Sequence, residues 1–202
     1  MTEVHGAPGT RRPGGRTART RAAVLRATLV ELGDSGYADL SMHAIALRAG
    51  VHKTTIYRRW RSKDQLVAAA LSEFAQLRIE VHDTGHIDRD ARALARSVAG
   101  VLRQRTGAAA VRALVSATQT HERHRIARQF WTSRLLAVRP MIDRAIELGQ
   151  LPRGTDAAQV IDAIAAPLYF RLLVSAEPVT QAAADTSAAA ALAAARAGLF
   201  SR

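Results

Sequence analysis

A run of four polar residues, His52, Lys53, Thr54 and Thr55, has side chains suited to reading the edges of DNA bases. The ammonium group of lysine can donate to O6 and N7 of guanine, and threonine can contact a thymine methyl group or a base edge. A helix that packs into a protein core does not begin with four such residues. We therefore expect the run to face a partner, although the solvated start of an ordinary surface helix is the alternative.

The segment from about residue 41 to residue 60 has the layout that would present this run. It contains two short helical stretches separated by Gly50, which accepts the positive φ that a tight turn requires. The small shared core would consist of Ile45, Ala46, Ala49, Val51 and Ile56. A helix-turn-helix of this kind lays its second helix in the major groove, with the first residues of that helix at the base edges.

The charge of the chain favours a polyanionic partner. The 202 residues include 29 Lys and Arg against 17 Asp and Glu, which gives a formal net charge of +12. Residues 1–65 hold 12 of the basic and 5 of the acidic residues, so the first third of the chain carries more than half of the excess. Nucleic acid or an anionic membrane surface would fit such a balance.

Several classes of protein are disfavoured by what the sequence lacks. There is no cysteine for a disulfide, a thiol nucleophile or a thiolate metal site. No stretch approaches the roughly 18 uninterrupted apolar residues of a membrane span, and no apolar segment follows the N-terminal arginines as in a secretory signal. We therefore expect a cytoplasmic protein that does not associate with a membrane.

Catalytic and metal sites are also not expected. The sequence has no glycine-rich phosphate loop, no GxSxG and no HExxH motif. Two histidine pairs, His82 with His86 and His121 with His124, have spacings that can share a metal ion, but no third ligand follows either pair. We expect neither an enzyme nor a cofactor nor a bound metal.

The periodicity of apolar residues predicts an all-α chain of about nine helices. Residues 1–16, rich in glycine, proline and arginine, are predicted to be a disordered basic arm. Residues 17–66 would form a helix-turn-helix DNA-binding domain, and residues 67–202 a larger helical domain. The helices beyond the motif are expected at 63 to about 81, 88–105, 107–118, 122–148, 155 to about 175 and 181–200.

A family resemblance rests on residues of the motif and its flanks. They are Gly36-Tyr37, Ser41, Ile45-Ala46, Ala49-Gly50-Val51, Lys53, Thr55-Ile56-Tyr57, Trp60 and Ser62-Lys63-Asp64-Gln65-Leu66. With these, residues 20 to about 72 resemble the DNA-binding domain of TetR-type (TetR/AcrR) transcriptional regulators, without gaps. More weakly, residues 167–174 resemble a dimer-forming helix of one subgroup. His52 replaces the family's usual serine, and Thr54 replaces its usual glycine. The operator sequence of a relative therefore cannot be assigned to this chain.

The resemblance implies a DNA-binding regulator, more often a repressor, that binds a palindromic operator in double-stranded DNA as a homodimer and is released by a small-molecule effector. Lys63 stands where its ammonium group and a helix N-terminus suit a phosphate oxygen. Further phosphate contacts are expected from Ser41, Tyr57, Arg58, Arg59, Arg16 and Arg19. Arg16 and Arg19, with Arg11 and Arg12, would enter a minor groove or simply attract phosphates. The alternative is a sequence-tolerant architectural DNA-binding protein without a ligand.

The last two helices predict a dimer interface. The helix from Thr155 to about Ser175 is apolar over more than one face, and the alanine-rich helix after it permits close approach of two backbones. Two copies would bury these faces in a four-helix interface. Its predicted residues are Ile161, Ile164, Leu168, Leu172 and Leu192. The alternative is that both helices pack inside one subunit.

The few aromatic residues, 4% of the chain, predict the position of an effector pocket. The resemblance implies a pocket among the fourth to eighth helices. Its predicted lining is Phe74, Phe130, Trp131, Arg134, Tyr169 and Phe170. The aromatic pair beside the Arg134 cation would hold a flat or anionic organic molecule. Ordinary core packing of these rings is the alternative.

Overall fold

A computed structural model describes residues 15–76, 81–116 and 121–201, and within these ranges it contains helices and no strand. The predicted basic arm lies outside the described residues except for its last two positions, which begin the first helix. The helices are α1 (Gly15–Ser35), α2 (Met42–Ala49), α3 (Lys53–Arg59), α4 (Lys63–Ala75), α5 (Ile87–Arg103), α6 (Arg105–Ser116), α7 (His121–Glu147), α8 (Ala157–Phe170) and α9 (Gln181–Arg196). The predicted all-α fold is confirmed.

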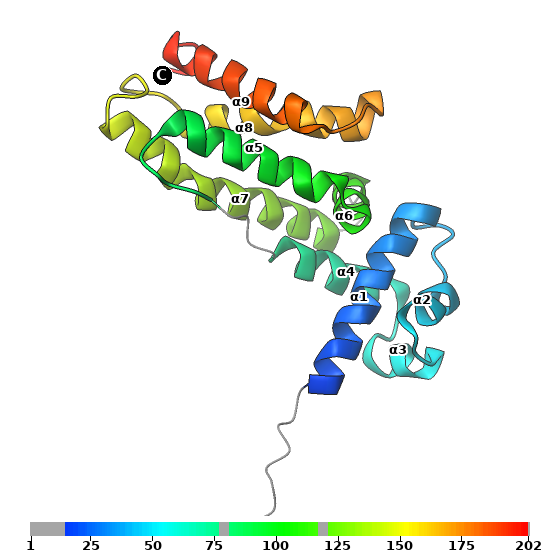
Figure 1. Cartoon of the computed structure of the whole chain (residues 1–202). Coiled ribbons are helices and arrows are strands. Elements are labelled where there is room, and N and C mark those ends of the chain that lie inside the picture. Colours follow the sequence, from blue (N-terminus) through cyan, green and yellow to red (C-terminus); the bar gives the residue numbers. More distant parts are fainter. Residues whose placement is uncertain (1–14, 77–80, 117–120, 202) are drawn as a thin grey trace, which may run out of the picture.

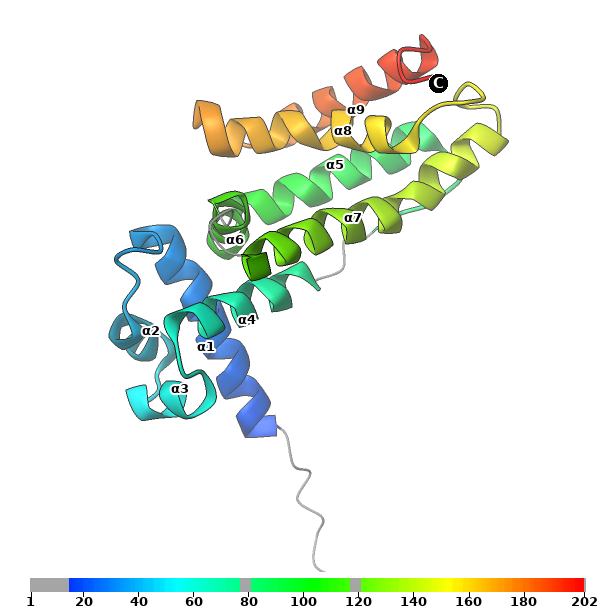
Figure 2. The same cartoon turned by 180° about the vertical axis from the view of Figure 1, so that it is seen from behind.

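The helices form two groups joined by α4 (Figure 1). We call α1, α2 and α3 the head, and α5 to α9 the body. Seen from either side, α4 crosses α1 at one end and lies beneath α7 at the other (Figures 1 and 2). The predicted domain boundary after residue 66 therefore falls inside α4, which belongs to both groups.

Local capping explains where the helices of the head begin and end. The Ser41 hydroxyl accepts hydrogen bonds from the backbone N–H groups of His43 and Ala44 at the start of α2. Gly50 closes α2 with φ 65°, a left-handed conformation that favours glycine. The Ser62 hydroxyl accepts from the N–H of Gln65 at the start of α4. Gly50 thus accounts for the short turn between α2 and α3, and the two serines account for the starts of α2 and α4.

The helix boundaries that differ from the prediction include those of α4, α8 and α9. In the described residues α4 ends at Ala75, and Val81 lies outside a helix. The cap of α8 is Asp156, whose carboxylate accepts from the N–H of Ala158 at 2.9 Å, and not Thr155, which donates to the Pro152 carbonyl. The last helix ends at Arg196 rather than at residue 200, just before Gly198 with φ 77°.

The head meets the body where α1 crosses α6 (Figure 1). A Cβ atom added to Gly33 of α1 would lie 2.4 Å from the Cβ of Ala109 in α6, so the two helices approach as closely as glycine allows. Beside this crossing, Arg105 of α6 donates to Asp34 at 2.6 Å, and Arg48 of α2 donates to the same carboxylate at 3.1 Å. Asp34 thus joins the body to two helices of the head.

One described segment, Ala157–Ser175, is apolar and long enough to cross a membrane, by length and composition alone. It comprises α8 and the π-helical turn η2 (Arg171–Ser175) that continues it. In this fold it packs against α5, α7 and α9 along one side. A core helix with one uncovered face accounts for the same composition.

Candidate nucleic-acid interface and cavity

The start of α3 projects from the head. His52, Lys53 and Thr54 are exposed, Thr55 is half-buried, and Ile56 is fully buried against the rest of the motif. Ile45 and Ala46 of α2 are buried with it, while Ala49 and Val51 are half-buried. The predicted small core is therefore present, and it holds α3 with its first residues directed outward.

Cationic and hydroxyl side chains surround this start. Tyr57, Arg58 and Arg59 are exposed on α3, and the Lys53 ammonium lies 5.6 Å from the centre of the Tyr57 ring. A hollow of about 340 Å³ separates α3 from the first turns of α1, and Arg21, Arg58 and Arg59 are among the residues that line it. Arg21, which the sequence analysis did not single out, also pairs with Glu73 of α4. Arginine side chains from both α1 and α3 therefore line this hollow.

Other predicted phosphate ligands have contacts of their own. Ser41 is exposed, but its hydroxyl accepts the capping hydrogen bonds of α2. The Arg19 guanidinium donates to the backbone carbonyl of Gly15 within α1. The side chain of Arg16, and Arg11 and Arg12, lie outside the described residues.

Lys63 connects the start of α4 to the turn that follows α1 in the head. Its ammonium donates to the carbonyl oxygens of Tyr37 at 2.9 Å and Ala38 at 3.1 Å, and it lies 4.6 Å from the centre of the Tyr37 ring. The Tyr37 hydroxyl donates in turn to Asp64 at 2.6 Å. An ammonium group has three N–H donors. Lys63 thus uses two of them to fix the turn after α1 onto the start of α4, and its predicted phosphate contact remains a prediction.

A cavity of about 540 Å³ lies between α5, α7 and α8. Three of the six residues predicted for a pocket line it, namely Trp131, Arg134 and Tyr169. The rest of the lining was not predicted from the sequence as part of a pocket: Leu94, Val98, Thr132, Leu135, Val138, Ile161, Asp162, Ile164, Ala165 and Ala166. Phe74 and Phe130 are buried beside the cavity rather than in its wall, and Phe170 is exposed outside it.

Four aromatic rings form a continuous series from α8 to α4. The Tyr169 ring meets Trp131 edge to face with centroids 5.1 Å apart, and Trp131 meets Phe130 in the same way at 4.7 Å. Phe130 stacks on Phe74 of α4 at 5.7 Å. Phe74 and Phe130 therefore connect the cavity wall to α4, which is a different role from the lining that the sequence predicted.

Burial alters the ionisation of the polar groups in the cavity. It raises the pKa of Tyr169 to about 12, against a smaller opposite effect of the Arg134 cation. Burial also lowers the pKa of Arg134 from its usual value. The pKa of Asp162 is raised, mainly by burial and further by the nearby carboxylate of Asp156. At neutral pH the Tyr169 hydroxyl is therefore protonated and available as a donor.

The predicted dimer residues lie inside the subunit. Ile161, Ile164, Leu168 and Leu192 are buried among α5, α7, α8 and α9 of the single subunit, and their place in a dimer interface stays a prediction. Leu172 is half-buried. The exposed apolar side chains of this segment are instead Phe170 and Val174, exposed by 56% and 68%. The other helices of the body cover one face of α8 and leave these two residues uncovered.

Known families and proteins match both groups of helices. The family described as "Bacterial regulatory proteins, tetR family" matches residues 24–70, and "Tetracyclin repressor-like, C-terminal domain" matches residues 81–191. The HTH-type transcriptional regulator AqdR of Rhodococcus erythropolis is 30% identical over 146 residues, 72% of this chain and 70% of AqdR. The DNA-binding transcriptional repressor TetR of Mycobacteroides abscessus is 44% identical over 70 residues, 34% of this chain and 37% of that protein. The crystal structure of the TetR family transcription regulator SCO0332 superposes with a TM-score of 0.59 at 29% identity, covering 87% of this chain and 97% of that one.

Proposed function

Because the chain belongs to the TetR family of helix-turn-helix transcriptional regulators, we propose that it is a repressor that binds a palindromic operator as a homodimer and leaves it when a small molecule occupies the cavity. The observation that carries this proposal is the outward-facing start of α3, where His52, Lys53 and Thr54 are exposed over a buried Ile56. The relatives it matches are named as transcriptional regulators, not as enzymes. Regulators of this family work on DNA in the cytoplasm.

The charged surface around α3 supports a division of labour in DNA binding. His52, Lys53, Thr54 and Thr55 would read base edges, since the first residues of a recognition helix lie deepest in the major groove. Tyr57, Arg58 and Arg59 would contact phosphates, which position the protein but carry no sequence information. The hollow between α1 and α3, with Arg21, Arg58 and Arg59 at its wall, would admit the DNA backbone.

The uncovered apolar face of α8 and η2 supports a homodimer. Phe170 and Val174 are large, apolar and mostly exposed in the single subunit. A second copy related by a two-fold axis would cover them with the same residues of its own. Such an axis would also place two heads on successive major grooves, about 34 Å apart along the DNA.

The series of rings supports release by way of α4. A molecule in the cavity would displace Trp131 or Tyr169, and close packing would pass the displacement through Phe130 to Phe74. Phe74 lies at one end of α4, and at the other end Lys63 holds the turn after α1. To empty the operator, the molecule must bind the released form more tightly by several kcal/mol.

Selection of bound fragments from random duplexes with the purified protein tests this function. We expect a consensus with two-fold symmetry whose half-sites are one helical turn apart. Equal affinity for unrelated duplexes would refute the proposal and favour an architectural protein without a ligand.

A further inference from the structure

The cavity between α5, α7 and α8 is apolar along its length and aromatic at one end. Leu94, Val98, Leu135 and Val138 are among the residues that line it. At the aromatic end, the Trp131 and Tyr169 rings meet edge to face with centroids 5.1 Å apart. A volume of about 540 Å³ suits an organic molecule of drug size. Rings pack favourably on rings in offset or edge-on geometry, so this end favours an aromatic occupant.

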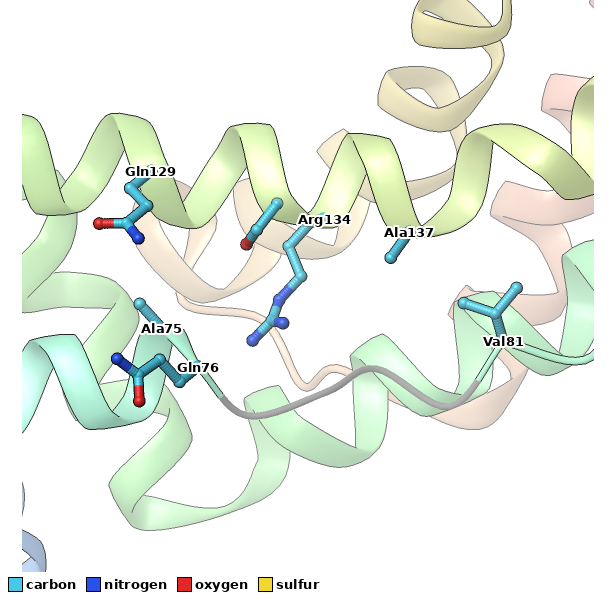
Figure 3. A pocket seen from close by; sticks show the side chains of 7 residues that line it. Ala75, Gln76, Val81, Gln129, Arg134 and Ala137 are labelled. Atoms are coloured by element: carbon cyan, nitrogen blue, oxygen red, sulfur yellow. The ribbon is translucent and has the colours of Figure 1, made fainter.

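Arg134 is the one cationic side chain among the residues that line the cavity. It also lines a second hollow of about 490 Å³ beside the end of α4, with Ala75 and Gln76 on the opposite wall. Figure 3 shows the Arg134 side chain reaching from α7 toward that end of α4. The same residue therefore stands between the cavity and the helix that joins head and body.

The guanidinium of Arg134 lies against an aromatic ring. Its central carbon is 4.7 Å from the centre of the Phe130 ring, and Phe130 packs in turn on Phe74 and Trp131. A guanidinium group is planar and carries its N–H donors in a rigid fork, with which arginine binds a carboxylate through two parallel hydrogen bonds.

The electrostatics of the cavity favour an acid with its charge at this end. Burial lowers the pKa of Arg134, and a carboxylate beside a guanidinium group favours its charged form. The Tyr169 hydroxyl remains protonated and can donate as well. At the far end of the cavity stands Asp162, seven residues before Tyr169 on α8, about 10 Å along the helix. Its carboxyl group disfavours a second acid there.

We propose that the cavity takes an aromatic carboxylic acid, with its ring against Trp131 and Tyr169 and its carboxylate on Arg134. This inference rests on the proposed function, because it names the chemical class of the molecule that would release the protein from DNA. A carboxylate at Arg134 would also act directly on the residue that faces the end of α4.

Matched acids and amides test the inference on the full chain without DNA. The probes are benzoate, 2-naphthoate and anthracene-9-carboxylate, each compared by calorimetry with its own carboxamide, which keeps the shape and removes the charge. At least one acid is expected to bind about tenfold more tightly than its amide. Arg134→Met should abolish this ratio. Arg128→Met, a change of an exposed arginine on the same helix, should preserve it.

Three results would overturn the inference. They are equal binding of every acid and its amide, an unchanged ratio in Arg134→Met, and no acid binding at about 1 mM. If Arg134→Met does not fold, Arg134→Lys serves instead, because it keeps the charge but loses the paired hydrogen bonds and should lower the ratio. Each of these results leaves operator selection by the wild-type protein unaffected. A protein that prefers the acids but selects no operator would refute the proposed function instead.

Discussion

The crossing of α1 and α6 allows a prediction whose size follows from the structure. In Gly33→Ala, the new methyl group would lie 2.4 Å from the Cβ and 3.2 Å from the Cα of Ala109. Carbon atoms in contact are about 3.5–4.0 Å apart, and neither atom of Ala109 belongs to a flexible side chain. The two helices must therefore move apart by roughly 1 Å, which costs about 1–3 kcal/mol as overpacking.

Gly100 of α5 provides the matched control. It is also a helical glycine, but a Cβ there would meet nothing within 4 Å. Gly100→Ala should therefore stabilise the protein by about 0.5–1 kcal/mol through helix propensity alone. Gly33→Ala gains a similar stabilisation from helix propensity, but the overpacking against Ala109 destabilises it. Its melting temperature should therefore lie about 2–12 °C below that of Gly100→Ala in thermal denaturation followed by circular dichroism.

The double variant Gly33→Ala/Ala109→Gly isolates the contact. It moves the methyl group from α6 to α1, so the close approach is restored and part of the lost stability should return. The double-mutant cycle should show a favourable coupling of about 1–3 kcal/mol. Equal melting temperatures for Gly33→Ala and Gly100→Ala, together with a coupling near zero, would refute the packing argument.

Three further predictions concern other parts of the chain. Ala176 has a left-handed backbone (φ 54°), so Ala176→Gly should raise stability by about 1 kcal/mol in thermal denaturation, and a loss would contradict the strain. Phe170→Glu should weaken dimers by roughly 30-fold, about 2 kcal/mol, in sedimentation equilibrium, whereas Leu47→Glu in the exposed head should not; equal effects would argue against this interface. Hydrogen bonds from Arg196 lower the pKa of Asp88, so the pair stabilises the fold above about pH 4 and this contribution disappears as pH falls through the lowered pKa. Asp88→Asn should therefore cost at most about 1 kcal/mol at pH 7 in urea denaturation, and this cost should shrink as pH falls below about 4; an undiminished cost in acid would contradict this origin.

The motif was predictable from the sequence because its determinants are local. Ser41 and Ser62 cap helices through contacts with residues two or three positions away, and Gly50 closes α2 by its own backbone conformation. The outward direction of the run from His52 follows from one buried neighbour, Ile56. Two adjacent residues that can both cap a helix are harder to distinguish from the sequence, and the N-cap of α8 is Asp156 rather than Thr155.

The body was less predictable because its helix faces are assigned by distant partners. The segment of α8 and η2 carries apolar residues on more than one of its faces. Their spacing alone therefore did not indicate that Ile164 and Leu168 face α5, α7 and α9 while Phe170 and Val174 stay uncovered. Similarly, composition located the aromatic rings but did not separate those in the cavity wall from those behind it. Asp162 was missed because nothing in its own segment indicates a cavity.

The proposed function of α3 requires that its first residues read bases while its later residues hold the DNA backbone. Operator selection with the wild-type protein, Lys53→Ala and Arg58→Ala, followed by affinity measurements over a range of salt, tests this claim directly. Lys53→Ala should lose about 1–3 kcal/mol of preference at one position in each half-site. Arg58→Ala should keep the consensus and reduce the salt slope by about one. Identical behaviour of the two variants, or no consensus for the wild type, would contradict the account.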